Sequence, residues 1–231
     1  MAEEGVVLIS AWTSPFGARV KIALHEKGVE YDYVEEDLLS ENKSPLLLKT
    51  NPVHRKIPVL IHGGRPVCES SIIVQYIDET WSGDGSKLQL LPCDSHDRAR
   101  ARFWVNYIDQ KIYSTGRLVW GVAPSAEAKE TAKKELLLCF KELEKELGTK
   151  EYFGGKSFGF VDVCLIPFYS RFYALEKGGG LIVSEECPGL EAWANRCLQR
   201  QSVSESLPDQ RKVYNFILEA NKKLQANAQA R

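Results

Sequence analysis

The sequence predicts an α/β unit followed by an all-α unit, and two observations lead to this fold class. Between residues 6 and 80, short apolar runs and turn residues alternate with helical patterns in the order β-α-β and then β-β-α. After residue 90, this alternation of strand and helix patterns gives way to long stretches with apolar residues at helical spacing. We therefore expect an α/β domain over residues 1–82, a linker over 83–92 and an all-helical domain over 93–231.

The first strand and the first helix are predicted from one continuous stretch. Val6–Ser10 is a short apolar run typical of a buried strand. Ser14-Pro15 then forms a common helix start, because serine caps the free N–H groups and proline suits the first helical position. Gly28 supplies the helix end. The helical stripe between these signals consists of Phe16, Val20, Ala23 and Leu24.

A second strand, a hairpin and a helix complete the α/β unit. Tyr31–Glu35 alternates like a strand, and after a polar segment Ile57–Ile61 and Pro66–Cys68 are predicted as strands joined by a Gly63-Gly64 turn. A helix over Ser70–Thr80 follows. This element order is that of a thioredoxin-like domain. In that fold the proline that begins the third strand is usually cis, so we predict a cis bond before Pro58.

The second unit contains helical patterns and few strand signals. One apolar stripe runs through Phe103–Val119, and a second helix opens at Pro124-Ser125 and continues to about Leu147. Gly159–Asp162 is predicted to cap the next helix, with a role in folding and not in chemistry. Gly178–Gly180 is predicted to be a flexible connection. Further helices are expected over 160–177, 188–201 and 208–225.

Composition excludes several classes of function. The 30 Lys and Arg residues nearly balance the 31 Asp and Glu residues, so no positive field favours nucleic acid or an anionic membrane. No signal-peptide core and no membrane-length apolar run are present, which predicts a cytoplasmic protein. The 6 cysteines form no C-x-x-C pair or zinc spacing, so we expect thiols that mostly fill the core. The 4 histidines show no metal-ligand spacing, and no metal site is predicted.

Several short strings, taken together in their order and spacing, indicate a known family. They are TSPF at 13–16, EEDL at 35–38, NKS at 42–44, NPVH at 51–54, KIPVL at 56–60, CES at 68–70, RFW at 102–104 and GFVD at 159–162. With these strings the sequence resembles the tau class of plant glutathione transferases over nearly the whole chain. A local departure is the segment 38–42, which is longer than is usual in that class and puts the reach of Lys43 in question.

The resemblance implies a catalytic role for Ser14. A free thiol has a pKa of about 8.5, so a transferase must stabilise the thiolate of glutathione. A hydrogen bond to a charged group and a helix N-terminus together lower such a pKa by about one to two units. Ser14 and the helix that it begins could supply both. Local sequence alone favours a plain helix cap at Ser14, and only the wider resemblance favours catalysis, although both roles can coexist at one helix end.

The resemblance also implies the other glutathione contacts. Ser70 and its helix start would hold the γ-glutamyl carboxylate, and Glu69 would meet the ammonium group. The backbone of Ile57, just before Pro58, would pair with the cysteinyl amides. The exposed lysines Lys43 and Lys56 are candidates for the glycine carboxylate.

The second substrate is expected to bind between the two domains. Tyr113, Arg117 and Trp120 have helical spacing and resemble pocket residues of the tau class. Phe16 and Phe216 are further candidate walls, although aromatic stripes are more often plain core. Near Arg171, related sequences often carry an aromatic residue, and a cation there would change the preference of the pocket.

The predicted function is conjugation of glutathione thiolate to electrophilic, mostly hydrophobic small molecules in detoxification and stress response. Reduction of organic hydroperoxides by glutathione is a possible second activity. The alternative is a non-enzymatic carrier of hydrophobic metabolites. Glutathione is a co-substrate in this scheme and no resident cofactor is expected, while the family implies a two-fold homodimer.

Overall fold

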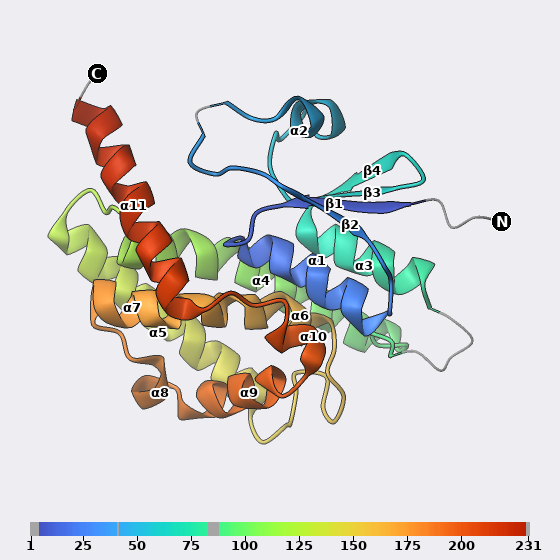
Figure 1. The fold of residues 1–231 in the computed structure, drawn as a ribbon. Helices are drawn as coiled ribbons and strands as arrows, with labels where there is room; N and C mark the ends of the chain where they lie inside the picture. The colour runs from blue at the N-terminus through green and yellow to red at the C-terminus, as the bar shows by residue number, and fades with distance from the viewer. Residues whose placement is uncertain (1–4, 41, 83–87, 230–231) are drawn as a thin grey trace. The chain divides into compact units, whose positions relative to one another are not determined.

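The computed structural model describes residues 5–40, 42–82 and 88–229 (Figure 1). The chain divides into two compact units, Met1–Leu91 and Pro92–Arg231, each of which is described by itself. Part of the predicted linker, residues 83–87, and Glu41 of the long segment 38–42 lie outside the described residues.

The first unit is a mixed sheet with helices, as predicted. Strand order is β2-β1-β3-β4, with β1 parallel to β2 and all other neighbours antiparallel (Figure 1). Helices α1 and α3 pack against each other. The elements are β1 (Val6–Ser10), α1 (Pro15–Glu26), β2 (Asp32–Glu35), α2 (Pro45–Thr50), β3 (Val59–His62), β4 (Arg65–Cys68) and α3 (Ser70–Thr80).

The sheet of the first unit has a buried centre because its middle strands are apolar. Ile9 of β1 pairs with Val59 of β3, and both pack with Leu47 of α2. The neighbouring residues Leu8 and Leu60 are also cross-strand partners and are fully buried. Successive residues of a strand point to opposite faces, so both faces of the sheet centre are covered.

The turns of the first unit follow the sequence signals. Gly63 and Gly64 both have positive φ, 56° and 74°, as the two-residue turn between β3 and β4 requires. The peptide bond between Ile57 and Pro58 is cis, which confirms that prediction. Helix α2 was not predicted, although Ser44-Pro45 repeats the signature of Ser14-Pro15 and Ser44 Oγ accepts from Leu47 N at 3.1 Å.

The second unit is helical throughout its regular elements, as predicted. The two long helices, α4 and α5, pack against each other, and α4 also contacts α6 and α7. The elements are α4 (Ser95–Trp120), α5 (Ala126–Leu147), α6 (Phe160–Leu165), the 3₁₀ helix η1 (Ile166–Arg171), α7 (Phe172–Gly179), α8 (Val183–Glu186), α9 (Pro188–Leu198), α10 (Gln201–Ser204) and α11 (Gln210–Gln229).

Two expectations for the second unit are wrong. The single helix expected over 160–177 is broken by η1, where Pro167 removes a backbone donor near the start of the tighter turn. Gly178 and Gly179 are not a flexible connection, because they end α7 in close contact with α4. A Cβ at Gly179 would collide with Val119 Cγ1, and one at Gly178 would lie 3.3 Å from Trp120 Cα. Gly180, with φ of 64°, then caps the helix.

The cysteines match the expectation of core thiols. All 6 are free, and Cys139, Cys164, Cys187 and Cys197 are buried. Cys68 is half-buried and Cys93 is exposed. Among the described residues, no helix combines the length and the apolar character that a membrane crossing demands.

Candidate functional site

Ser14 caps α1 and still has a hydroxyl proton to donate. Its backbone is extended, and its Oγ accepts a hydrogen bond from Gly17 N at 3.1 Å. A serine hydroxyl has one donor and two acceptor positions, so this bond leaves the donor unused. Gly17 permits the arrangement, because a Cβ there would collide with Ser10 Oγ in β1. The positive end of α1 and one O–H donor therefore lie at the same point.

Arg19 links the starts of α1 and α3, and sequence reasoning missed it. Its guanidinium is buried, and Nη1 donates to Ser70 Oγ at 3.1 Å. The guanidinium carbon also lies 5.0 Å from the ring centroid of Phe16. A charged residue three positions after Phe16, on the apolar stripe of a helix, is the signal that could have identified it.

Glu69 has a strained backbone where α3 begins. Its φ of 69° and ψ of 116° are rarely adopted by residues other than glycine, and such strain costs about 1–3 kcal/mol. Glu69 is the capping position but makes no side-chain cap, and its side chain is exposed. Ser70 is the first helical residue and is 6 % exposed. The carboxylate of Glu69 is therefore not used to close its own helix.

The loop that leads to Ile57 is organised by the buried Asn51. Asn51 Nδ2 donates to the carbonyl of Lys56 at 2.9 Å, and Asn51 Oδ1 accepts from His54 N at 3.1 Å. Ile57 itself is half-buried and precedes the buried Pro58. The string NPVH at 51–54 thus fixes the backbone around Ile57 and leaves the imidazole of His54 exposed.

Lys43 and Lys56 are exposed cations on either side of α2. Within the described part of the chain, neither ammonium group forms an ion pair with a carboxylate. Glu36, a residue without a predicted role, fixes the segment next to Lys43. It is 3 % exposed, its Oε1 accepts from Ser44 N at 2.9 Å, and its own N–H donates to Ser10 O at 2.7 Å.

In the second unit, α4 brings three of the predicted pocket residues together. The ring centroids of Tyr113 and Trp120 lie 6.5 Å apart, and the Arg117 guanidinium lies 6.0 Å from the Tyr113 ring. Phe216 lies on α11, whose Asn221 donates to Trp120 O at 3.3 Å. Phe16 belongs to the first unit.

Two further residues shape this aromatic group. Gly116 lies directly beneath the indole of Trp120, where a Cβ would collide with the ring. Arg171 of η1 is buried, and its Nη1 donates to Ser170 Oγ at 2.9 Å. Burial lowers the pKa of Arg171 to about 10, and the neighbouring Tyr113 opposes that change. A buried cation therefore stands beside the predicted aromatic wall.

The predicted cap at Gly159–Asp162 is confirmed and is larger than expected. Asp162 Oδ2 accepts from Gly159 N at 2.9 Å. Its Oδ1 accepts from Phe153 N at 3.0 Å and from Trp193 Nε1 at 2.8 Å. One buried carboxylate thus connects three separate segments of the second unit.

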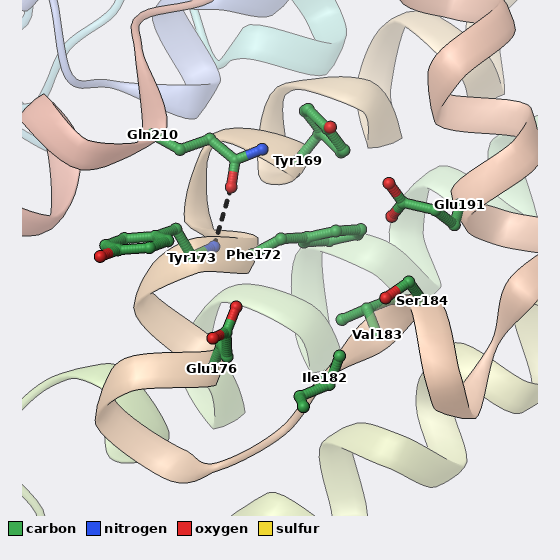
Figure 2. Close-up of a pocket in the computed structure, with 9 residues that line it drawn as sticks. All are labelled: Tyr169, Phe172, Tyr173, Glu176, Ile182, Val183, Ser184, Glu191 and Gln210. Carbon is green, nitrogen blue, oxygen red and sulfur yellow. Dashed lines mark hydrogen bonds between the residues drawn. The ribbon is translucent and has the colours of Figure 1, made fainter.

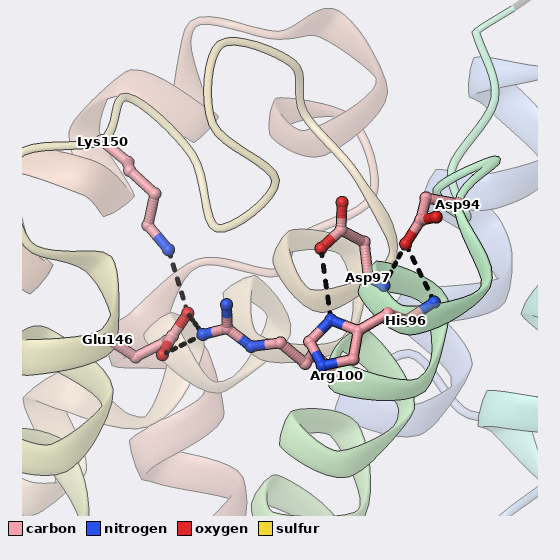
Figure 3. A network of polar contacts seen from close by, with 6 residues as sticks. All are labelled: Asp94, His96, Asp97, Arg100, Glu146 and Lys150. Atoms are coloured by element: carbon pink, nitrogen blue, oxygen red, sulfur yellow. Dashed lines mark hydrogen bonds and ion pairs between the residues drawn. The ribbon is translucent and has the colours of Figure 1, made fainter.

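A group of metal-type side chains at the start of α4 is explained by helix capping. Asp94, His96 and Asp97 place one ligand-type atom each within 4.8 Å of one another, and all three are exposed. Figure 3 shows Asp94 Oδ1 accepting from the backbone N–H groups of His96 and Asp97, at 2.9 and 3.0 Å. These bonds lower the pKa of Asp94. The arrangement is that of an N-cap carboxylate.

Comparisons with known proteins cover almost the whole chain. The family model "Glutathione S-transferase, N-terminal domain" matches residues 4–79, and "Glutathione S-transferase, C-terminal domain" matches residues 101–201. The chain is 55% identical to the probable glutathione S-transferase parC of Nicotiana tabacum, over 94% of this chain and 96% of that protein. It is 54% identical to glutathione S-transferase U25 of Arabidopsis thaliana, over 97% of this chain and 98% of that one.

Solved structures with this fold include two of the tau class or named as glutathione transferases. One is rice GST1 (OsGSTU1) in complex with glutathione, with a TM-score of 0.89 and 46% identity over 96% of this chain and 99% of that chain. The other is the tau class glutathione S-transferase MiGSTU from mango, with a TM-score of 0.84 and 39% identity over 93% and 98% of the two chains.

Proposed function

The chain belongs to the glutathione S-transferase family and, within it, to the tau class, and on that premise we propose that it conjugates reduced glutathione to electrophilic, mostly hydrophobic small molecules. The thiol proton passes to solvent, and the thiolate sulfur attacks an electrophilic carbon. A carbon–sulfur bond forms, and the leaving group departs with its electron pair. With an organic hydroperoxide, attack on oxygen yields an alcohol and a glutathione sulfenic acid, which a second glutathione converts to the disulfide and water.

Ser14 is the residue that carries this proposal. Its Oγ already accepts from Gly17 N, so its remaining O–H is available to donate to sulfur at the positive end of α1. The hydroxyl stabilises the thiolate and does not remove the proton, because its own pKa is far too high. Each pKa unit corresponds to about 1.4 kcal/mol, so a lowering of one to two units requires about 1.4–3 kcal/mol.

The remaining glutathione contacts follow from positions in the first unit. The strained cap at Glu69 leaves its carboxylate exposed for an ammonium group, and Ser70 presents the start of α3 to a carboxylate. The backbone of Ile57 pairs with the cysteinyl amides, with Pro58 holding that strand end. Lys43 and Lys56 have no carboxylate partner among the described residues, which supports a role in binding the glycine carboxylate.

The test separates the two roles of Ser14 with two variants. Ser14→Ala removes both the cap and the donor, whereas Ser14→Gly removes the donor but keeps a residue that is tolerated at caps. Both should reduce turnover of a chloronitroaromatic electrophile by about 10- to 100-fold at pH 6.5. The thiol pKa of bound glutathione should rise by about one to two units, and only the alanine variant should lose about 1 kcal/mol of stability.

Ser125→Ala is the matched control. Ser125 caps α5 with the same geometry, accepting from Ala128 N at 3.1 Å, but it lies in the second unit. This variant should lose stability without losing turnover. Unchanged turnover and thiol pKa in both Ser14 variants would show that Ser14 is only a helix cap.

The electrophile is proposed to contact the aromatic group of Tyr113, Arg117 and Trp120, with Phe16 and Phe216 as further walls. The mutual contacts of the three α4 residues support this assignment. A non-enzymatic carrier is not favoured, because the relatives matched over nearly the whole chain are named as transferases. Tight ligand binding without turnover across a panel of electrophiles would reverse that preference.

We also propose a homodimer in the cytoplasm that needs no resident cofactor or metal. Exposed apolar side chains on each unit support contacts with a partner: in the first unit Val53 is 82 % and Ile72 52 % exposed, and in the second unit Phe103 is 60 % exposed. Light scattering should give twice the chain mass, and Val53→Asp should shift the measured mass toward that of the monomer.

Turnover should survive dialysis against a chelator, because no metal or resident cofactor is proposed. A fluorescent fusion should label the cytoplasm.

A further inference from the structure

The second unit contains a pocket that no predicted site residue lines. It has a volume of about 200 Å³ and lies among η1, α7, α8, α9 and the start of α11 (Figure 2). Drug-sized ligands occupy pockets of about 300–1,000 Å³, so this one suits a small molecule or a single head group. Its chemistry is set by Tyr169, Phe172, Tyr173, Glu176, Glu191 and Gln210.

One side of this pocket is an aromatic wall held in place by Gln210. The ring centroids of Tyr169 and Phe172 lie 5.2 Å apart at an angle of 58°. Gln210 Oε1 accepts from Tyr173 N at 2.9 Å, and the Gln210 side chain also hydrogen-bonds the Tyr169 phenol. One amide thus joins the start of α11 to Tyr169 in η1 and to Tyr173 in α7. Aromatic faces carry negative potential and attract cations.

The carboxylate of Glu191 faces the same wall and lacks a counter-charge. Figure 2 shows its side chain reaching toward Phe172. No lysine, arginine or histidine of the described residues lies within ion-pair distance of Glu191. Burial raises the pKa of Glu191, while its hydrogen bond with Asn195 opposes the rise. A half-buried carboxylate is stabilised when a cation joins it.

The opposite side of the pocket already has cations from the chain itself. Lys177 Nζ pairs with Glu176 at 2.6 Å and lies 5.4 Å from the Tyr173 ring centroid. The Arg211 guanidinium lies 5.9 Å from the same centroid. Over the described parts of the chain, no such cation lies over Tyr169 or Phe172. The uncompensated negative charge of this pocket is therefore that of Glu191.

We propose that this pocket binds a small organic ammonium ion, with Glu191 as its counter-charge and the faces of Tyr169 and Phe172 as its wall. Aromatic rings around a carboxylate are the arrangement that recognises alkylated ammonium groups, since the rings tolerate the methyl groups that a simple salt bridge excludes. The site is separate from the residues proposed for glutathione and the electrophile, so the inference goes beyond the transferase reaction.

Choline is the probe, and its neutral carbon isostere, in which a tert-butyl group replaces the trimethylammonium group, is the comparison ligand. Binding to the full chain is measured by ligand-detected proton NMR at constant ionic strength. Choline should bind at least about tenfold more tightly than the isostere, because only choline gains the ion pair and the cation–π contacts. Equal affinities, or no binding of choline, would overturn the proposal.

Variants then locate the site. Glu191→Gln keeps the shape of the side chain and should weaken choline binding by about tenfold, with the isostere unaffected. Glu176→Gln should change it by less than about threefold, because Lys177 already neutralises that carboxylate. Glu185→Gln, an exposed change on α8 outside the lining, is the control for net charge and should have no effect. Equal choline affinity in the Glu191→Gln and wild-type proteins would exclude this pocket.

Each variant is checked for folding by circular dichroism and for glutathione conjugation, both of which should match the wild type. If Glu191→Gln loses helix signal as well as choline binding, misfolding could explain the lost binding. Tyr169→Leu then tests the site instead, because it keeps the carboxylate and removes one aromatic face. Retained choline affinity in folded Tyr169→Leu would overturn the role of the aromatic wall.

Discussion

Replacing Asp162 should destabilise the second unit strongly, because this carboxylate satisfies three buried donors. Asp162 is fully buried and accepts from Gly159 N, Phe153 N and Trp193 Nε1 at 2.8–3.0 Å. In Asp162→Ala all three N–H groups lose their acceptor. Each buried unsatisfied donor costs about 1–3 kcal/mol, which gives about 3–9 kcal/mol in total.

Relief of the buried charge reduces this loss. Burial raises the pKa of Asp162 to about 6, against the opposing hydrogen bonds, and the ordinary value is about 3.9. The difference means that ionisation of Asp162 in the folded protein costs about 3 kcal/mol more than in water. The free energy of unfolding of Asp162→Ala should therefore fall by about 3 kcal/mol at pH 7.5, the middle of a range from about 0 to 6 kcal/mol.

The same pKa predicts a pH dependence with a definite sign. Between about pH 4 and pH 6 the folded chain holds a proton on Asp162 that the unfolded chain has lost, so stability from this group falls as pH rises. Asp162→Asn has no ionisable group at this position. Its amide NH₂ also replaces one carboxylate oxygen and faces an N–H donor that it cannot accept from. Its deficit relative to wild type should be about 1.4 kcal/mol larger at pH 5 than at pH 7.5.

Urea unfolding followed by circular dichroism measures both effects, with protein concentration held constant because a dimer would couple to unfolding. Asp209→Ala is the control. Its carboxylate also caps a helix, accepting from Arg211 N and Lys212 N, but it is exposed and should lose only about 1 kcal/mol. A gain of stability in Asp162→Ala, or a pH-independent deficit in Asp162→Asn, refutes the reasoning.

Two further predictions concern buried contacts of each unit. Lys27 Nζ lies 2.7 Å from Asp78 Oδ1 and donates to Leu88 O at 2.7 Å. Lys27 and Asp78 are both buried, so Lys27→Met should lower the free energy of urea unfolding by about 3 kcal/mol. Asp78, which also accepts from Leu90 N and Leu91 N at 2.9 Å, would then be a buried carboxylate without its cation, and a loss below about 1 kcal/mol would contradict the reasoning. Gly116→Ala should cost about 1–3 kcal/mol and alter tryptophan fluorescence, because its Cβ collides with Trp120 despite the better helix propensity of alanine. A stabilised Gly116→Ala variant would show that the indole can move away at no cost.

Local signals predicted the elements of the first unit well because each one has a short-range cause. The Gly63-Gly64 turn follows from the positive φ of both residues, and α1 follows from the cap at Ser14. Helix α2 has the same start signature at Ser44 and could have been predicted from it. It was missed because only six residues follow the cap, too few for an amphipathic stripe.

Contacts between distant segments could not be predicted in this way. The hydrogen bond from Arg19 to Ser70 joins residues 51 positions apart, and no local pattern specifies it. Gly178 and Gly179 present a different difficulty. Their local pattern is clear but has two meanings, since glycine is typical both of flexible segments and of closely packed backbones. Only the approach of α4 decides between the two at those positions. The same applies to the pocket at Glu191, whose lining comes from five separate elements.

Ser14 can act both as a helix cap and as a donor to the thiolate, because the oxygen and the proton of its hydroxyl form separate hydrogen bonds. The bond from Gly17 N occupies one lone pair of Oγ, and this bond limits the rotation of the side chain. An acceptor bond to the helix leaves the O–H free to point away from it, toward where an anion would be attracted by the helix dipole. Capping therefore orients the O–H donor before an anion binds, and other anion-stabilising sites use donors that are preorganised in the same way. This makes Ser14→Gly the decisive variant, because glycine removes the donor and is still tolerated at a helix start, so the loss of the side-chain cap costs little stability.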